Sequence, residues 1–390
     1  MGSIIIGIVK SILAFGKNTG LVLAMIALVV YLALLIPKTH VANGSAGSLA
    51  ATNLQFNQSL GENSTNSYIY CVGDSGYGNE NLSYYAQISA NGIGEWTQTT
   101  SYPVGVDDVG CDIYGNHIYC IGTNDTMSEN ETFYARISAN GIGNWTAGTP
   151  YPVPTTYQSC SAYRGYIYCV GNWKIPSNDS YYTKILKNGS IGGWNGTTRY
   201  PIPFYWGSCS INNGYIYCVG GPDVSHYPGE ADSQVINSAN KNYSLTYFAA
   251  VSSSGIGKWT QTTPFPSKFF LNGCSVYNNY IYCIGGEPST GNAHYAPLSE
   301  NGIGSWMNTT SLPIDNEQGG CAIHLGYIYC VGSRDPTSAH HQVWYAKIMN
   351  GGGIGNWTES TPYPIPVYGD SYCEIPGSGG SFTGGGGPEN

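Results

Sequence analysis

Twelve cysteines are the residues of this chain whose type and spacing most plainly could do chemistry. A thiol can be oxidised to a disulfide, ligate a metal or stay free, and no Cys-x-x-Cys spacing typical of a metal site occurs. Ten cysteines form pairs whose members are nine residues apart: Cys111 with Cys120, Cys160 with Cys169, Cys209 with Cys218, Cys274 with Cys283, and Cys321 with Cys330. This spacing favours disulfides, formed in an oxidising compartment, over buried free thiols or a metal centre.

Each pair brackets two β-rich runs joined by a central dipeptide. The dipeptides are Gly115-Asn116, Arg164-Gly165, Asn213-Gly214, Asn278-Asn279 and Leu325-Gly326. Most suit a two-residue hairpin turn, which requires positive φ and so favours Gly or Asn. Counting outward from the turn places the two cysteines opposite each other at a non-hydrogen-bonded position, with Cα atoms about 4.5 Å apart. That separation lies within the range of a disulfide.

Cys71 and Cys373 remain. Cys71 matches the second run of such a hairpin, but no cysteine stands nine residues before it. Cys373 matches the first run, because Ile375 aligns with Ile113 and Ile323. The simplest interpretation is that the C-terminal strand completes the first structural unit and is bonded to it there. Such a closure would remove the open edges of a linear array of sheets.

The elements that must position these cysteines recur about every 49 residues. An I-Y-C-[VI]-G motif recurs with its cysteine at 71, 120, 169, 218, 283 and 330. A tryptophan that follows a Gly-rich turn, as in Asn91 to Trp96 (NGIGEW), recurs with the same period at positions 96, 145, 194, 259, 306 and 357. A variant of Thr-x-Tyr/Phe/Leu-Pro follows each tryptophan. Six copies of one unit indicate a solenoid or a propeller. Each unit offers four β-rich runs, for example 160–163, 166–170, 181–186 and 194–198, which favours propeller blades.

Between Tyr68 and Cys373 the chain resembles the Kelch-repeat family. The resemblance is carried by hydrophobic runs that end in Gly-Gly, at Val219 to Gly221 and Ile284 to Gly286, and by the later Tyr and Trp of each unit. It implies an all-β, six-bladed β-propeller with four-stranded blades. Four units lack the full double glycine, and the N-G-I-G turn lengthens the Tyr-to-Trp spacing.

The N-terminal region is of a different kind. Residues 21 to 37 read LVLAMIALVVYLALLIP, and with Thr19 and Gly20 they just reach the length of a transmembrane helix. Lys10 and Lys17 precede the run, which favours a cytoplasmic N-terminus. We therefore expect a cytoplasmic or interfacial segment (1–18), a signal-anchor helix (19–37), an extracytoplasmic linker (38–66), the propeller (67–376) and a Gly-rich tail (377–390). A signal peptide cut near Ala46 and a pilin-type leader cut near Gly20 are alternatives.

Asn-x-Ser/Thr sequons follow this run and none precedes it, which places the rest of the chain outside the cytoplasm. The glycosylation candidates within the predicted propeller are Asn81, Asn124, Asn130, Asn144, Asn178, Asn188, Asn195, Asn242, Asn308 and Asn356.

Function is expected on one face of the propeller. We letter the strands of a blade A to D from the centre outward. The A–B turns are two residues long and the C–D turns are a uniform N-G-I-G segment. Differences in length and sequence between the blades therefore fall in the B–C and D–A loops, which lie on one face. Residues that approach the inner strands from the D–A loops form a predicted binding rim: Asp107, Asp108, Tyr157, Tyr205, Trp206, Phe270, Glu317, Tyr368 and Asp370. Aromatic rings and carboxylates on this rim suit the binding of a sugar, and a protein ligand is the other kind of partner we consider. The alternative is that the aromatic side chains only pack Pro-rich loops together.

Catalytic and nucleic-acid functions are disfavoured. The chain has only four Arg, and Arg164 lies in a predicted turn and Arg136 in a predicted outer strand, so a sialidase-like arginine cluster on the loop face is implausible. A copper-radical oxidase would need a free cysteine, whereas all twelve cysteines are assigned to pairs. The net charge of −9 and the lack of a basic run argue against nucleic acid. We expect no metal, no cofactor and no enzymatic activity: a membrane-anchored extracellular glycoprotein for protein or glycan recognition, adhesion or cell-envelope structure. The alternative is a carbohydrate-active enzyme that uses Asp108, Glu317 or Asp370.

Overall fold

The computed structural model divides the chain into two units, Met1–Asn57 and Gln58–Asn390, and every residue described here belongs to the second. The structure describes residues 67–73, 81–105, 109–122, 130–172, 177–221, 244–267, 273–286, 291–316, 320–335, 338–367 and 372–377, with the backbone alone at 333–335 and 338–340. The expected N-terminal segment, anchor and linker, and the tail except for Gly377, lie outside these ranges. Within them no helix is long and apolar enough to span a bilayer.

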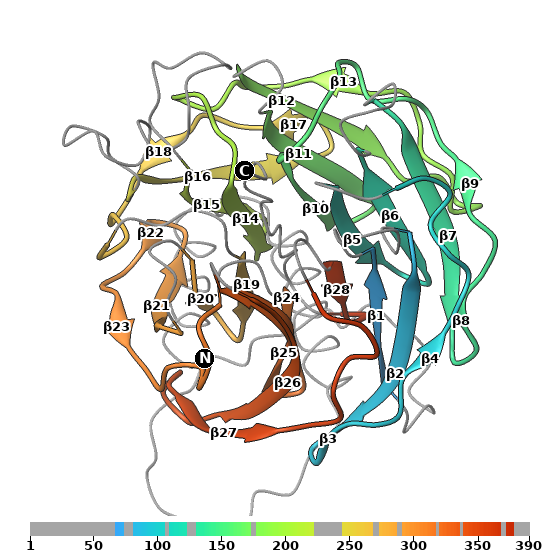
Figure 1. Ribbon diagram of the computed structural model, residues 1–390. Helices are drawn as coiled ribbons and strands as arrows, with labels where there is room; N and C mark the ends of the chain where they lie inside the picture. The colour runs from blue at the N-terminus through green and yellow to red at the C-terminus, as the bar shows by residue number, and fades with distance from the viewer. Residues whose placement is uncertain are drawn as a thin grey trace, which may run out of the picture. The chain divides into compact units, whose positions relative to one another are not determined.

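Six antiparallel sheets stand around a central axis as the blades of a propeller (Figure 1). This confirms the predicted six-bladed architecture. The inner strands (A) are β28 (Tyr372–Glu374), β5 (Gly110–Tyr114), β10 (Ser159–Tyr163), β14 (Gly207–Asn212), β19 (Gly273–Tyr277) and β24 (Gly320–His324), for blades 1 to 6 in that order. The second strands (B) are β1 (Ser67–Val72), β6 (His117–Ile121), β11 (Tyr166–Asn172), β15 (Tyr215–Gly220), β20 (Tyr280–Ile284) and β25 (Tyr327–Asp335).

The outer half of each blade is built from one long strand and one short edge. The third strands (C) are β2 (Ser83–Ser89), β7 (Thr132–Ser138), β12 (Ser177–Lys184), β16 (Thr246–Ser252), β21 (Ala293–Ser299) and β26 (Ser338–Ile348). The outer strands (D) are β3 and β4 (Gly92–Ile93, Thr97–Gln98), β8 and β9 (Gly141–Ile142, Thr146–Ala147), β13 (Asn195–Gly196), β17 and β18 (Gly255–Ile256, Thr260–Gln261), β22 and β23 (Gly302–Ile303, Met307–Asn308) and β27 (Ile354–Glu359). Most of these edges are only two residues long, which leaves little unpaired backbone exposed.

The hairpin register is the one that the cysteine spacing predicts. In blade 3, Tyr163 pairs with Tyr166 and Cys160 with Cys169. The turn residues Arg164 and Gly165 have φ of 48° and 79°, as a two-residue turn of this kind requires.

All five nine-residue pairs form disulfides, one in each of blades 2 to 6, with Cα–Cα distances of 4.0 to 4.2 Å. The predicted Cα separation of about 4.5 Å was therefore slightly too long, whereas the predicted pairing is confirmed. The bonds join Cys111 to Cys120, Cys160 to Cys169, Cys209 to Cys218, Cys274 to Cys283, and Cys321 to Cys330.

The ring is closed by the remaining cysteines. Strand β28 pairs antiparallel with β1, with Cys71 opposite Cys373, and the disulfide between them spans 302 residues of sequence. The inner strand of blade 1 thus comes from the far end of the propeller sequence, as the sequence predicts. In Figure 1 the red β28 lies beside the blue β1.

The repeated motifs outside the cysteines hold neighbouring blades together. At the junction of blades 1 and 2, Thr99 Oγ1 accepts a hydrogen bond from the Ile142 N–H (2.8 Å) and donates one to the Ile142 carbonyl (3.0 Å). The motif tryptophan donates to the preceding blade, as Trp194 Nε1 does to the Thr149 carbonyl at 3.0 Å. Six hydrophobic clusters lie between adjacent blades, so the core of this fold is divided among the blade junctions.

The C–D turns are less uniform than the sequence suggested. In blade 1 the turn lies between Ile88 and Ile93, whose Cα atoms pair directly, and blades 2, 4 and 5 repeat this spacing. In blades 3 and 6 the turn is one residue longer, from Ile185 to Ile191 and from Ile348 to Ile354. The expectation of one N-G-I-G turn throughout was wrong in length for these two blades, and in blade 4 the segment begins with Ser254 in place of Asn.

Candidate functional site

The two ends of the propeller differ in their connections. We call the end with the A–B and C–D turns the turn face, and the end with the B–C and D–A connections the loop face. Backbone hydrogen bonds place the two kinds of turn together: the Ile185 N–H donates to the Gly165 carbonyl (2.8 Å), and the Ile348 N–H to the Gly326 carbonyl (2.8 Å). The predicted rim belongs to the loop face.

Three of the predicted rim residues are described. Tyr157 lies ahead of β10 in blade 3, and Tyr205 and Trp206 lie ahead of β14 in blade 4. The other predicted rim residues fall outside the described ranges: Asp107, Asp108, Phe270, Glu317, Tyr368 and Asp370.

The three described side chains form one aromatic cluster. The Trp206 ring contacts Tyr157 edge-on at a centroid distance of 5.5 Å and Tyr205 at 5.1 Å. Tyr205 and Trp206 are buried, and Tyr157 is half-buried. Tyr157 is therefore the ring that a ligand on the loop face would reach, and the buried Trp206 ring packs against it.

The backbone of this cluster is strained. Tyr157 and Trp206 have φ of 56° and 55°. Bulky residues are rarely found in the left-handed region, where a non-glycine residue costs on the order of 1–2 kcal/mol. The two residues occupy equivalent places, since Tyr157 lies three residues before Cys160 and Trp206 three before Cys209. Strain of this kind persists where the surrounding structure enforces it, and it gathers at binding sites.

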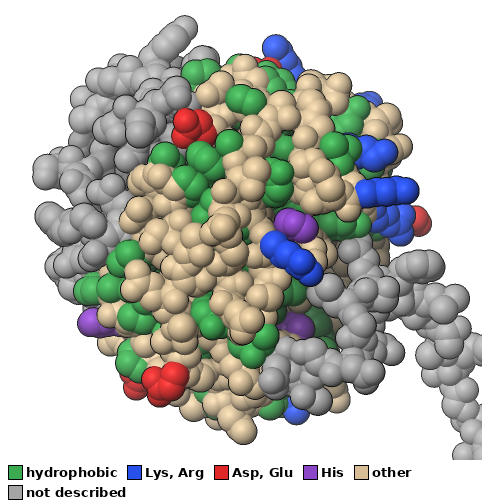
Figure 2. Space-filling view, turned by 90° about the vertical axis from the view of Figure 1, so that its right-hand side faces the viewer, with side chains coloured by type: hydrophobic (Ala, Val, Ile, Leu, Met, Phe, Trp, Pro, Cys, Tyr) green, Lys and Arg blue, Asp and Glu red, His purple; other side chains and the backbone are tan. Residues whose placement is uncertain are grey.

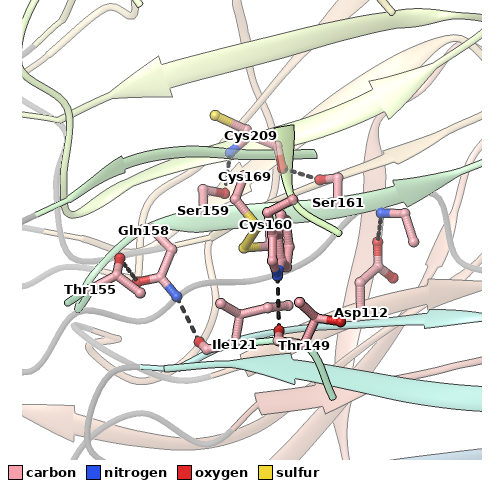
Figure 3. Close-up of a disulfide and its surroundings, with 12 residues drawn as sticks. Asp112, Ile121, Thr149, Thr155, Gln158, Ser159, Cys160, Ser161, Cys169 and Cys209 are labelled. Atoms are coloured by element: carbon pink, nitrogen blue, oxygen red, sulfur yellow. Dashed lines mark hydrogen bonds between the residues drawn. A yellow bond between two sulfur atoms is a disulfide. The ribbon is translucent and has the colours of Figure 1, made fainter. Parts of the chain in front are cut away.

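Hydrogen bonds around the inner end of the loop enforce this conformation. Gln158, next to Tyr157, is fully buried; its amide donates to the Ile121 carbonyl (2.6 Å) and its carbonyl oxygen accepts from Thr155 Oγ1 (2.9 Å). Ser159 Oγ accepts from the Cys209 N–H, and Ser161 Oγ donates to the Cys209 carbonyl, both at 2.9 Å. Figure 3 shows these contacts around the Cys160–Cys169 disulfide. They tie blade 3 to blades 2 and 4 directly below the aromatic cluster.

Asp112 is a buried carboxyl group that the sequence reasoning missed. It lies on β5, 5% exposed, and its two oxygens accept the Ile113 and Ala162 N–H groups, each at 2.6 Å. Figure 3 shows Asp112 with one of these two hydrogen bonds. Burial raises the pKa of Asp112 to about 7, although the two N–H donors act to lower it. The sequence held a signal, because the residue after the first cysteine of the hairpin is Ser in blades 3, 4 and 5. One Asp112 oxygen accepts from Ala162 of blade 3 and the other from Ile113 of its own strand. Because both oxygens are used within the protein, this geometry assigns Asp112 a structural role at the junction of blades 2 and 3.

The described histidines do not form a site. Burial lowers the pKa of His117, His294 and His324, so these rings are neutral at pH 7, and they belong to blades 2, 5 and 6. Across the described ranges no group of three His, Cys, Asp or Glu side chains could hold a metal ion.

The sequons are spread over the outside of the blades. Asn144, Asn188, Asn195, Asn308 and Asn356 are exposed. Asn81, Asn130 and Asn178 are half-buried, and the Asn178 amide donates to the Tyr200 carbonyl (2.8 Å). Asn124 and Asn242 lie outside the described residues.

Comparison with known proteins supports the fold alone. No model of a known protein family matches the chain, and no curated protein matches it either. Solved structures do match. One, described as "Structure of YjhT", superposes with a TM-score of 0.54 at 15% sequence identity, over 72% of this chain and 94% of that chain. An identity this low leaves the function to be argued from the residues of this chain.

Proposed function

We propose that this protein is a membrane-anchored, extracytoplasmic, Kelch-like propeller that recognises a glycan or protein ligand on its loop face. The observation that carries the proposal is the pair of left-handed aromatic residues, Tyr157 and Trp206, at equivalent places in adjacent blades. A packing role alone would be met by ordinary backbone geometry, whereas an enforced outlier is typical of a binding surface.

The location rests on other features. Six disulfides join all twelve cysteines, and such bonds persist in oxidising compartments. The apolar run of residues 21–37 supplies the anchor, and the exposed sequons suit N-glycosylation. Glycan recognition is favoured within the proposal, because Tyr157 offers a partly exposed ring on which a sugar can stack.

The test is a glycan array probed with the full chain in detergent micelles, with a hydrolysis screen on every glycan retained. Tyr157→Ala is expected to weaken binding roughly three- to tenfold, the range of one aromatic contact. Tyr163→Ala is the matched control, since Tyr163 is half-buried at the other end of the same strand β10, on the turn face. Equal loss in both variants would reject the loop-face site. Turnover abolished by Asp108→Asn or Glu317→Gln would favour the carbohydrate-active enzyme instead.

A further inference from the structure

The basic side chains are concentrated at the turn face. Among described residues with side chains, every Lys and Arg except Arg199 lies in a turn of that face or on the strand ends beside it: Arg136, Arg164, Lys184, Lys187, Lys258 and Lys347. Of the described acidic residues that are not buried, Glu95 and Glu300 lie at the same end, whereas Glu131, Asp179, Asp315 and Glu359 lie toward the loop face. Figure 2 shows most of the Lys and Arg side chains in view toward one edge of the propeller. A protein of net charge −9 thus has a basic turn face.

The same face has exposed apolar side chains, and they lie in the two unusual blades. In blades 1, 2, 4 and 5 the first residue of the C–D turn is a serine, as at Ser89. In the two longer turns this residue is Leu186 in blade 3, 43% exposed, and Met349 in blade 6, 53% exposed. Leu325 in the A–B turn of blade 6 is 75% exposed and has a φ of 46°, a left-handed conformation that is costly for leucine.

These residues define two patches, each of which combines exposed apolar side chains with basic ones. The blade 3 patch is Leu186 with Arg164, Lys184 and Lys187, and the blade 6 patch is Leu325 and Met349 with Lys347. Their turns have equivalent hydrogen bonds: the Leu186 N–H donates to the Ser190 carbonyl (2.7 Å), and the Met349 N–H to the Gly353 carbonyl (2.7 Å). Blades 3 and 6 stand on opposite sides of the ring (Figure 1). A small ligand cannot contact both patches, but a flat surface can.

The chain itself indicates which surface. Strand β1 begins at Ser67 on the turn face, where Ser67 Oγ and His324 Nε2 form a 2.8 Å hydrogen bond. The apolar run that ends at Pro37 therefore connects to the propeller on the basic side. An anionic lipid surface attracts nearby Lys and Arg, and exposed Leu and Met side chains can enter its interface.

We propose that the turn face docks on an anionic membrane surface through the blade 3 and blade 6 patches. The proposal rests on the membrane anchor of the proposed function. The anchor holds the propeller near the bilayer at high effective concentration, so few contacts suffice. Docking of this kind turns the loop face, with Tyr157, away from the membrane and toward ligands outside the cell.

Hydrogen exchange of the full chain in vesicles tests the proposal. Vesicles of phosphatidylcholine with about 30% phosphatidylglycerol are compared with phosphatidylcholine alone, and peptides covering 185–191 and 348–354 are followed. We expect slower exchange in the anionic vesicles by roughly threefold or more, reversed by about 0.5 M salt, which shortens the screening length to a few ångströms. Equal exchange in the two lipids would overturn the docking.

Matched variants separate the contributions. Lys184→Glu with Lys347→Glu should abolish the protection, whereas Arg199→Glu, a charge reversal toward the loop face, should leave it unchanged. Leu186→Ser installs the serine of the four regular blades and should weaken protection of the blade 6 peptide without changing the melting temperature. Protection that depends on protein concentration in both lipids would indicate self-association and overturn the proposal. A chain that fails to float with either vesicle would instead refute the anchor.

Discussion

Removing the closing disulfide is the sharpest perturbation of this fold. The double variant Cys71→Ala with Cys373→Ala releases a loop of 302 residues, whereas Cys209→Ala with Cys218→Ala releases one of nine. Both bonds join fully buried cysteines with Cα atoms 4.1 Å apart, so the lost packing is matched. In the chain-entropy model, the closing bond contributes about 5.7 kcal/mol and the hairpin bond about 2.7 kcal/mol. The predicted difference in unfolding free energy is therefore ~3 kcal/mol.

Guanidinium unfolding under non-reducing conditions, followed by tryptophan fluorescence, measures both variants against the parent protein. The midpoint of the closing variant should fall well below that of the hairpin variant. Equal destabilisation, or a larger loss in the hairpin variant, would refute the view that ring closure by β28 is the dominant constraint on the unfolded chain. Non-reducing peptide mapping of the parent should recover a peptide that links Cys71 to Cys373.

Three further predictions concern the blade junctions. Folding raises the pKa of Asp112 from 3.8 to about 7, so as pH rises the carboxyl group ionises first in the unfolded state. The free energy of unfolding should therefore fall between about pH 4 and 7, by at most ~4 kcal/mol. Denaturation curves at several pH values should show this fall in the parent protein and not in Asp112→Asn. Gly141→Ala should lower the melting temperature strongly, because φ is +97° and the new Cβ would lie 2.9 Å from the Tyr85 ring. The control Gly115→Ala, whose φ is +63° and whose new Cβ would lie in open space, should cost only about 1 kcal/mol of stability. Equal effects of the two substitutions would contradict the packing argument. Trp194→Phe removes a 3.0 Å hydrogen bond to the preceding blade and should cost about 1 kcal/mol in urea unfolding, while an unchanged midpoint would mean that the bond contributes nothing.

The cysteines were predictable because their geometry is local. A nine-residue spacing around a two-residue turn admits one register, and Cys373 could be placed through its alignment with the same hairpin. The number of blades was predictable too, because each repeat of the sequence folds into one blade. A repeated motif does not show, however, in which direction its side chains point. That Trp194 and Thr99 contact neighbouring blades depends on how successive blades pack, which no single repeat encodes.

The site was predictable only in outline. Topology alone placed Tyr157 and Trp206 ahead of the inner strands, but their left-handed backbone is imposed by contacts such as Gln158 to Ile121, between residues of different blades. The longer turns of blades 3 and 6 were overlooked although the sequence shows them, because the shared N-G and I-G dipeptides obscured one extra residue. Asp112 was overlooked because an acidic residue in a strand is conspicuous only when the six units are aligned column by column.

The pairing of β1 with β28 also sets the order in which the protein can be made. If the chain is exported as proposed, each nine-residue hairpin can oxidise as soon as its own two strands appear. Cys71 is the first of the twelve to appear and the last to find its partner, since Cys373 follows all the others. Until Cys373 appears, the Cys71 thiol has no correct partner, and any hairpin cysteine that appears before Cys373 can pair with it wrongly. Productive folding requires the local hairpins to oxidise faster than Cys71 can intercept them, so the tight two-residue turns serve fidelity of assembly as well as stability.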